Sequence, residues 1–163
     1  MKEVSVIRVI QNWSMQGAIG VVLKEKDGDR RFIFFVDHAV GGAIIRALES
    51  LPSHRPLTHD LLLTILSTLR GTLRHVVITE AKEGTFYARV VLEANGESHD
   101  LDARPSDAVA LAAATKAPIF VEEAFLAELA AKQDLTKPVP LSILWPLGAN
   151  RPPKSPEAPV KPE

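Results

Sequence analysis

The chain contains no cysteine among its 163 residues. Disulfide bonds and thiolate metal sites are therefore excluded, which fits a reducing compartment. No run of about 18 apolar residues could span a membrane, and the N-terminal segment lacks the apolar stretch of a secretory signal peptide. These absences favour a cytoplasmic protein with no membrane partner.

A strong charge of one sign is also missing, because the formal net charge is −1 and the pI is about 6.5. A protein that holds nucleic acid by bulk electrostatics is normally basic. The charges are nevertheless uneven: arginine and histidine gather in residues 44–76, and nine acidic residues lie in 93–134. Opposed patches suit self-association, or a polyanion on one face with a metal on the other. A mixed, solvated surface is the ordinary alternative.

Several catalytic motifs are absent as well. The sequence has no phosphate loop, dinucleotide glycine fingerprint, His-x-x-x-His zinc pair or nucleophile elbow. Glu80-Ala81-Lys82 closes an apolar strand, as in many metal-dependent nucleases. Because Lys82 falls in a predicted hairpin turn, however, it would point away from an acid on the strand.

The apolar periodicity predicts an α+β fold over residues 1–145, with a mainly antiparallel sheet and packed helices. Strands are predicted at 4–10, 19–25, 31–37, 73–80, 85–93, 98–103 and 117–121. Helices are predicted at 43–51 after Gly41-Gly42, at 57–71 with Thr58 as N-cap, from Ser106 onward, and at 122–133. Asn95-Gly96 is a strong signal for a type I′ hairpin turn.

The sequence also contains a weak internal repeat. A strand, a short junction and a helix occur around residues 31–48 and again around 98–114, which indicates two related β-rich halves. From residue 146 the chain is rich in proline and lacks large apolar residues except Val160. Such a segment cannot offset the entropy of ordering, so residues 146–163 are predicted to be a disordered or extended tail.

The junction Arg104-Pro105-Ser106-Asp107 is the first candidate site. Ser106 could cap the following helix, Asp107 suits its dipole, and Pro105 keeps Arg104 extended. These structural roles do not explain the side chain of Arg104. An arginine beside a helix N-terminus could bind a phosphate or a carboxylate.

Carboxylates near this junction are candidates for a metal site. Asp100, Asp102 and Arg104 share one face of a predicted strand, and Asp107 lies just beyond it. Carboxylate oxygens at this spacing could hold Mg²⁺ or Mn²⁺. The alternative is an exposed polar face at the edge of a sheet.

Two further pairs combine a histidine with an aspartate. His59 and Asp60 fall in the first turn of a predicted helix, where His59 could act as an acid or base near neutral pH. Asp37-His38 ends the third predicted strand, a common ligand position and also a common start of a turn. For both pairs, a purely structural role stays open.

Three sequence segments are similar to those of a known protein family: RPLTHDLL (55–62), VVITEAKEGTFYARVVL (76–92) and LDARPSDAVALAAATKAPIFV (101–121). In this order and spacing, they resemble the bifunctional nuclease domain family over roughly residues 3–130. The resemblance implies a compact α+β domain, a homo-oligomer, and hydrolysis of DNA and RNA with a divalent metal, Mg or Mn. The residues that match its motifs, and carry over as candidates, are His59, Asp60, Arg104, Ser106 and Asp107.

The chain departs from the family pattern at residues 36–43. Family members usually carry a Glu-Ala junction here, whereas this chain reads VDHAVGGA. If the missing acid is a metal ligand, the chain would be inactive or would use Asp37 instead. If it is a helix cap, nothing is lost.

The sequence thus favours a nuclease of broad specificity. Asp102 and Asp107 would hold the metal, with Asp37 and Asp60 as further candidates; Arg104 would steady the phosphate and His59 would transfer a proton. Two alternatives stay open: a non-catalytic protein-interaction module, and a sensor of a phosphate-containing ligand.

Overall fold

The computed structural model describes residues 1–11, 18–83, 85–133 and 144–145. The predicted tail at 146–163 lies outside them. The strands are β1 (Lys2–Gln11), β2 (Ile19–Glu25), β3 (Arg31–Val36), β4 (Gly71–Lys82), β5 (Thr85–Ala94), β6 (Glu97–Ala103), β7 (Ile119–Val121) and β8 (Leu144–Trp145). The helices are α1 (His38–Leu48), α2 (Thr58–Thr68), α3 (Pro105–Thr115) and α4 (Glu123–Lys132). No helix in these ranges is both long and apolar enough to cross a membrane.

The sheet joins two similar halves. Its order is β3-β2-β1-β7-β4-β5-β6, and β8 pairs with β1 off this path. Each half is an antiparallel three-stranded meander followed by a helix, α1 after β3 and α3 after β6. The short strand β7 lies between them, antiparallel to β1 and parallel to β4. The predicted α+β fold with two related β-rich halves is therefore confirmed.

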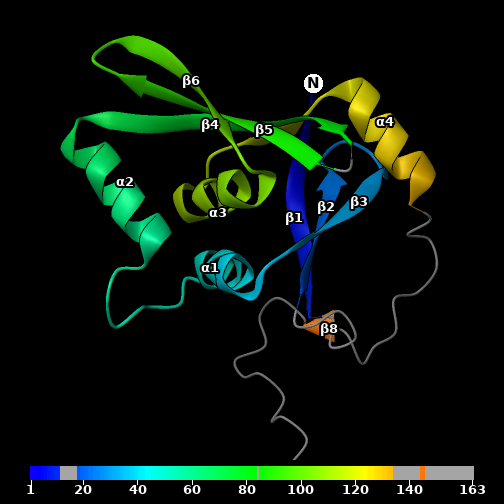
Figure 1. Cartoon of the computed structure of the whole chain (residues 1–163), viewed down its shortest axis with the longest axis horizontal. Helices are drawn as coiled ribbons and strands as arrows, with labels where there is room; N and C mark the ends of the chain where they lie inside the picture. The colour runs from blue at the N-terminus through cyan, green and yellow to red at the C-terminus, as the bar shows by residue number, and fades with distance from the viewer. Residues whose placement is uncertain (12–17, 84, 134–143, 146–163) are drawn as a thin grey trace, which may run out of the picture.

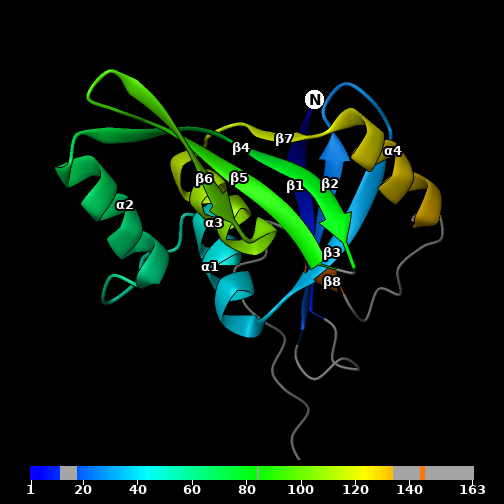
Figure 2. The same ribbon diagram turned by 45° about the horizontal axis from the view of Figure 1, so that its top comes forward.

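One continuous core fills the curl of the sheet. In both ribbon views the strands β4, β5 and β6 pass over α3, with α1 below it (Figure 1 and Figure 2). The largest fully buried side chains include Phe32 of β3, Ile44 of α1, Ile78 of β4 and Leu126 of α4, all in the same cluster. Helix α2 differs, because none of its residues is buried.

Helix α1 begins earlier than predicted. We expected it to start after Gly41-Gly42, but it starts at His38, with the Asp37 side chain accepting hydrogen bonds from the first turn. Gly41 lies inside the helix because α1 packs closely on β2. A Cβ atom at Gly41 would lie 2.5 Å from the Cδ1 atom of Ile19, so only glycine fits this approach.

Two predicted caps are also wrong. Thr58 is the first residue of α2 and Leu57 is its N-cap; the Asp60 carboxylate accepts a hydrogen bond from the Leu57 N–H at 2.8 Å instead. Ser106 does not cap α3, whose N-cap is Arg104. Proline at the first helical position has no N–H to satisfy and has the φ angle of a helix, so α3 starts there.

The two edge strands of the sheet are protected from further pairing in different ways. At the β3 edge the Gln133 side chain makes both hydrogen bonds of a neighbouring strand: its Oε1 accepts from the Ile33 N–H at 2.7 Å, and its Nε2 donates to the Ile33 carbonyl at 3.0 Å. The other edge strand is β6. It carries exposed charged side chains, including Asp100 and Asp102, which discourage further strand pairing.

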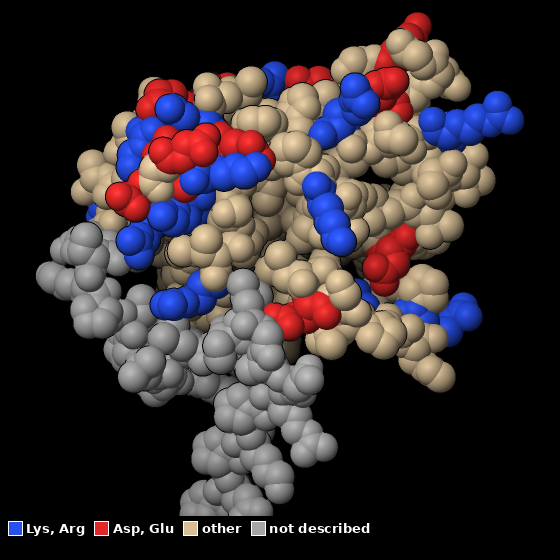
Figure 3. Space-filling view, turned by 180° about the vertical axis from the view of Figure 1, so that it is seen from behind, with Lys and Arg blue, Asp and Glu red and all other residues tan. Residues whose placement is uncertain are grey.

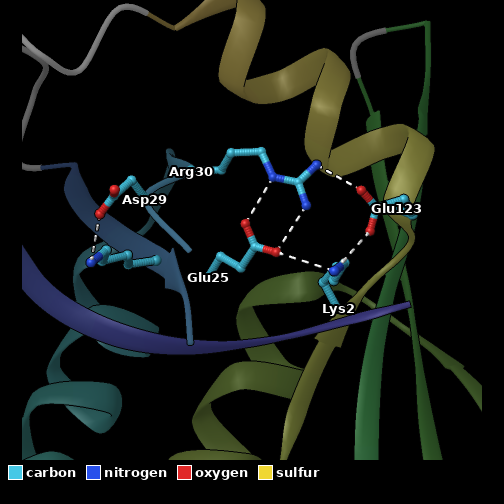
Figure 4. Close-up of polar contacts among 6 residues, drawn as sticks. Lys2, Glu25, Asp29, Arg30 and Glu123 are labelled. Atoms are coloured by element: carbon cyan, nitrogen blue, oxygen red, sulfur yellow. Dashed lines mark hydrogen bonds and ion pairs between the residues drawn. The ribbon is translucent and has the colours of Figure 1, made fainter. Parts of the chain in front are cut away.

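An ion network holds the start of β1, the β2–β3 hairpin and α4 together (Figure 4). The Glu25 side chain is 7% exposed and accepts hydrogen bonds from Arg30 Nε at 2.8 Å and Nη2 at 2.9 Å. Arg30 Nη1 also donates to Glu123 at 2.7 Å, and Lys2 lies 3.7 Å from Glu25. Hydrogen bonding from Arg30 holds the pKa of Glu25 below its ordinary value.

Replacing Arg30 with methionine should lower the free energy of unfolding at neutral pH, because the buried Glu25 carboxylate loses its main partner. A lowered pKa contributes stability above the unfolded-state value, near 4.5 for Glu25, and this stability is lost as pH falls through the folded-state pKa. The difference between wild type and Arg30→Met should therefore shrink below about pH 4.5. Urea unfolding over a pH series measures it, with Arg31→Met as the control at a neighbouring exposed arginine. A difference that stays constant across the series would contradict this account.

Candidate functional site between helices α1, α2 and α3

A cleft of about 770 Å³ opens where α1, the start of α2 and the start of α3 meet. One part of its lining is apolar and comes mainly from α1 and α2; it includes Val40, Leu57, Leu61 and Leu62. The polar part is His59, Arg104 and Asp107. The cleft therefore offers an apolar wall beside a compact group of ionisable side chains.

The polar group is centred on Asp107. Its Oδ1 lies 3.2 Å from His59 Nε2 and 3.1 Å from Arg104 Nη2, and its Oδ2 lies 2.6 Å from Arg104 Nε. A carboxylate can only accept, so in the neutral imidazole Nε2 carries the proton and Nδ1 is the basic nitrogen. The Arg104 side chain is 68% exposed, whereas His59 is 13% exposed. The histidine is thus oriented by the protein and the arginine remains open to solvent.

Asp60 has other hydrogen-bond partners than this group. Its pKa is lowered by the hydrogen bond from the Leu57 N–H and by the charge of Arg46, whose Nη2 lies 3.5 Å from Asp60 Oδ2. The sequence placed His59 and Asp60 in one candidate pair. The structure gives them different hydrogen-bond partners: His59 bonds to Asp107, and Asp60 accepts from the Leu57 N–H at the start of α2.

Asp37 is the N-cap of α1. Its Oδ1 accepts hydrogen bonds from Ala39 N–H at 2.9 Å and Val40 N–H at 3.0 Å. The bond from Val40 lowers the pKa of Asp37, and the positive charge of Arg104 lowers it further. Arg104 is therefore electrostatically linked to carboxylates on both sides, Asp37 and Asp107.

Asp102 lies on the exposed edge strand β6, opposite Arg89 in the strand register. Its neighbour Asp100 forms an ion pair with Arg89 at 2.8 Å. In the part of the chain that the structure describes, no three His, Asp or Glu side chains gather into a group that could hold a metal ion. These donors do not fit a preformed Mg²⁺ or Mn²⁺ centre, so no chemical step is derived through a metal here. The metal requirement stays a prediction.

The charge on the rear face of the molecule favours local rather than bulk recognition of a polyanion. Seen from behind, lysine and arginine are intermixed with aspartate and glutamate, and this face carries no continuous basic stripe (Figure 3). A nucleic acid on this face would find no extended field of positive charge.

The sequence match covers the whole of this site. The family model described as the bifunctional nuclease domain matches residues 21–134. The chain belongs to the bifunctional nuclease domain family. Two uncharacterized proteins of Mycobacterium tuberculosis, from strains CDC 1551 / Oshkosh and ATCC 25618 / H37Rv, are each 38% identical to it over 108 residues. The aligned stretch is 66% of this chain and 64% of each relative, so the chain spans slightly less than two thirds of their length.

A second, smaller pocket lies on the other side of His59 in this bifunctional nuclease domain. It measures about 240 Å³ and shares His59 and Ala43 with the larger cleft. Its basic residues are Arg46 of α1 and Lys116, which follows α3. Neither residue was predicted from the sequence as part of a site. The available signal was Arg46 itself, the one arginine in a helix whose other residues after His38 are apolar or glycine.

Substitutions at Asp37 separate a capping role from a metal-binding role. Asp37→Ala should lower the free energy of unfolding by about 1 kcal/mol, because two N–H groups lose their acceptor. Asp37→Asn keeps an acceptor oxygen and should cost much less. Chemical unfolding measures both, and titration with Mn²⁺ tests the other role. If Asp37→Asn were as stable as wild type but bound Mn²⁺ more weakly, Asp37 would be a metal ligand.

Proposed function

We propose that this protein hydrolyses phosphodiester bonds of DNA and RNA in the cleft between α1, α2 and α3. The observation that carries the proposal is the His59–Asp107–Arg104 group, within a chain that belongs to the bifunctional nuclease domain family. The group combines a basic nitrogen, a carboxylate that orients it, and a solvent-exposed guanidinium. A base that accepts the proton of water and a cation that stabilises the charge on phosphate both accelerate phosphodiester hydrolysis.

Each residue has a distinct part in the proposed reaction. Arg104 binds the phosphate through its exposed guanidinium, beside the free N–H groups at the start of α3. His59 Nδ1 takes a proton from the attacking water, while Asp107 stabilises the imidazolium that forms. The water oxygen bonds to phosphorus, and the bond from phosphorus to the leaving oxygen breaks. The leaving oxygen takes up a proton from solvent, and the His59 imidazolium returns its proton to solvent.

The assay uses single-stranded DNA, duplex DNA and RNA, each with Mg²⁺, with Mn²⁺ and with chelator. Wild type should cleave all three, whereas His59→Gln, Asp107→Asn and Arg104→Met should each lose about 100-fold or more in rate. Loss of cleavage in chelator would support the predicted metal requirement. Asp102→Asn tests whether the strand carboxylate contributes to it.

Arg74→Met, purified identically, is the control for a contaminating nuclease. Arg74 is also an arginine paired with a single carboxylate, Glu93 at 3.1 Å, but it lies on β4. Equal cleavage by wild type and by all three cleft variants would reject this site. No cleavage by any protein would leave the second candidate function below as the better one.

The second candidate function is a non-catalytic interaction module, and the exposed face of α2 favours it. Leu61, Leu62, Ile65 and Leu69 are 47% to 66% exposed, and Leu57 just before the helix is 47% exposed. Five such side chains form an apolar patch on the order of 400 Å², a size that often marks an interaction surface. In Figure 1 this helix stands apart from the other helices.

A second copy of the chain is the partner that we expect on the α2 face, as the predicted homo-oligomer requires. The apolar patch on α2 contains no charged side chain, so two copies can pack there without repulsion between like charges. Ile65→Glu should shift the protein to monomers in analytical ultracentrifugation, because it places a charge in the interface. Phe35→Glu is the control, since Phe35 is also 47% exposed but lies on β3. A monomeric wild type at high micromolar concentration would contradict the oligomer.

A further inference from the structure

The smaller pocket beside His59 has an unusual combination of shape and charge. Its floor consists of alanines on α1 and α3, whose small side chains let the two helices approach while leaving a hollow between them; these are Ala43, Ala47, Ala110, Ala113 and Ala114. Around this apolar floor stand Arg46, Lys116, His59 and Asp60. The two permanent cations outnumber the single carboxylate.

Arg46 is only partly satisfied within the described structure. Its side chain is 22% exposed, and its Nε atom is buried without a hydrogen-bond partner among the described residues. Its contact with Asp60 through Nη2 is long, at 3.5 Å. A guanidinium offers five N–H donors, and the long contact with Asp60 engages only Nη2. The buried Nε is closed off from the pocket, so the terminal N–H groups of Arg46 are the donors that an entering acceptor would meet.

Lys116 adds a second positive charge from the end of α3. It is the C-cap of α3 and has a left-handed backbone, with φ of 59°. Glycine is favoured in this conformation, and a lysine there is strained. The sequence nevertheless has a lysine at this position, where it lines the same pocket as Arg46.

We propose that this pocket binds a phosphate group that neighbours the scissile phosphate of a nucleic acid. His59 and Ala43 line both cavities, so a strand whose scissile phosphate meets Arg104 and His59 can continue directly toward Arg46 and Lys116. The inference rests on the proposed nuclease function for its substrate. The pocket would position the substrate, and it would favour substrates that carry a phosphate one nucleotide away from the cleaved bond.

The test compares dithymidylate without a terminal phosphate with the same dinucleotide phosphorylated at its 5′ end or at its 3′ end. Binding is measured by isothermal titration calorimetry, and chromatography verifies that the dinucleotides stay intact. Wild type should bind one of the phosphorylated forms about tenfold more tightly than the unphosphorylated form, as expected for one charge-assisted phosphate contact. Arg46→Met should remove this preference, so that the phosphorylated and unphosphorylated forms bind with similar affinity.

Lys116→Asn removes the second cation but keeps a residue that tolerates the left-handed backbone, and it should reduce the preference. Arg74→Met is the matched control and should retain it. Thermal unfolding of each variant identifies any loss of folding. An Arg46→Met protein that folds and still prefers the phosphorylated form would overturn the proposal.

The outcomes also separate this inference from the nuclease proposal. A phosphate preference that depends on Arg46, in a protein that never cleaves, would uphold the pocket and reject the nuclease. Cleavage with equal affinity for all three dinucleotides would uphold the nuclease and reject the pocket. Failure of wild type to bind any of them would overturn the pocket, and cleavage of longer strands would then decide the nuclease separately.

Discussion

The three residues of β7 are the constraint on which the rest of the structure depends. Ile119 pairs with Val4 of β1 on one side and with Val76 of β4 on the other, so β7 is the point where the two halves of the sheet join. Two flanking backbone hydrogen bonds extend this join: Val76 N–H donates to the Pro118 carbonyl, and Glu122 N–H donates to the Ile78 carbonyl, both at 3.0 Å. Because each half carries one helix after its third strand, joining the sheets also brings α1 against α3. Both cavities beside His59 follow from that contact.

Most of the fold could be predicted from the sequence because its signals are local. Strand alternation and turn residues depend on neighbours a few positions apart, and Asn95 and Gly96 both have the positive φ that their hairpin turn requires. The start of α1 could not be predicted in this way. Gly41 was interpreted as a break before the helix, whereas it is needed for the close packing of α1 on Ile19, a contact between distant parts of the chain.

In the candidate site too, residues with a local sequence signal were predicted, whereas contacts between distant parts of the chain were not. His59 and Asp107 were each identified from a motif, but their contact spans 48 positions and depends on how α2 and α3 pack. Asp37 and Asp60 were predicted as possible ligands or catalytic groups because a carboxylate near a helix start suits either that role or a cap. In the structure both accept backbone N–H groups. Arg46 was not predicted at all, since its importance comes from the pocket around it rather than from its neighbours in sequence.

The Gln133 amide that closes the β3 edge has a consequence for how copies of this protein could associate through their sheets. A strand needs free N–H and C=O groups on its neighbour, and Gln133 occupies both groups of Ile33 at the middle of β3. A strand from a second copy could therefore not pair at Ile33 without displacing Gln133, whereas at β6 only exposed charged side chains oppose such pairing. The two ends of the sheet thus resist edge-to-edge association by different means, a built-in hydrogen-bond partner at one end and charge at the other.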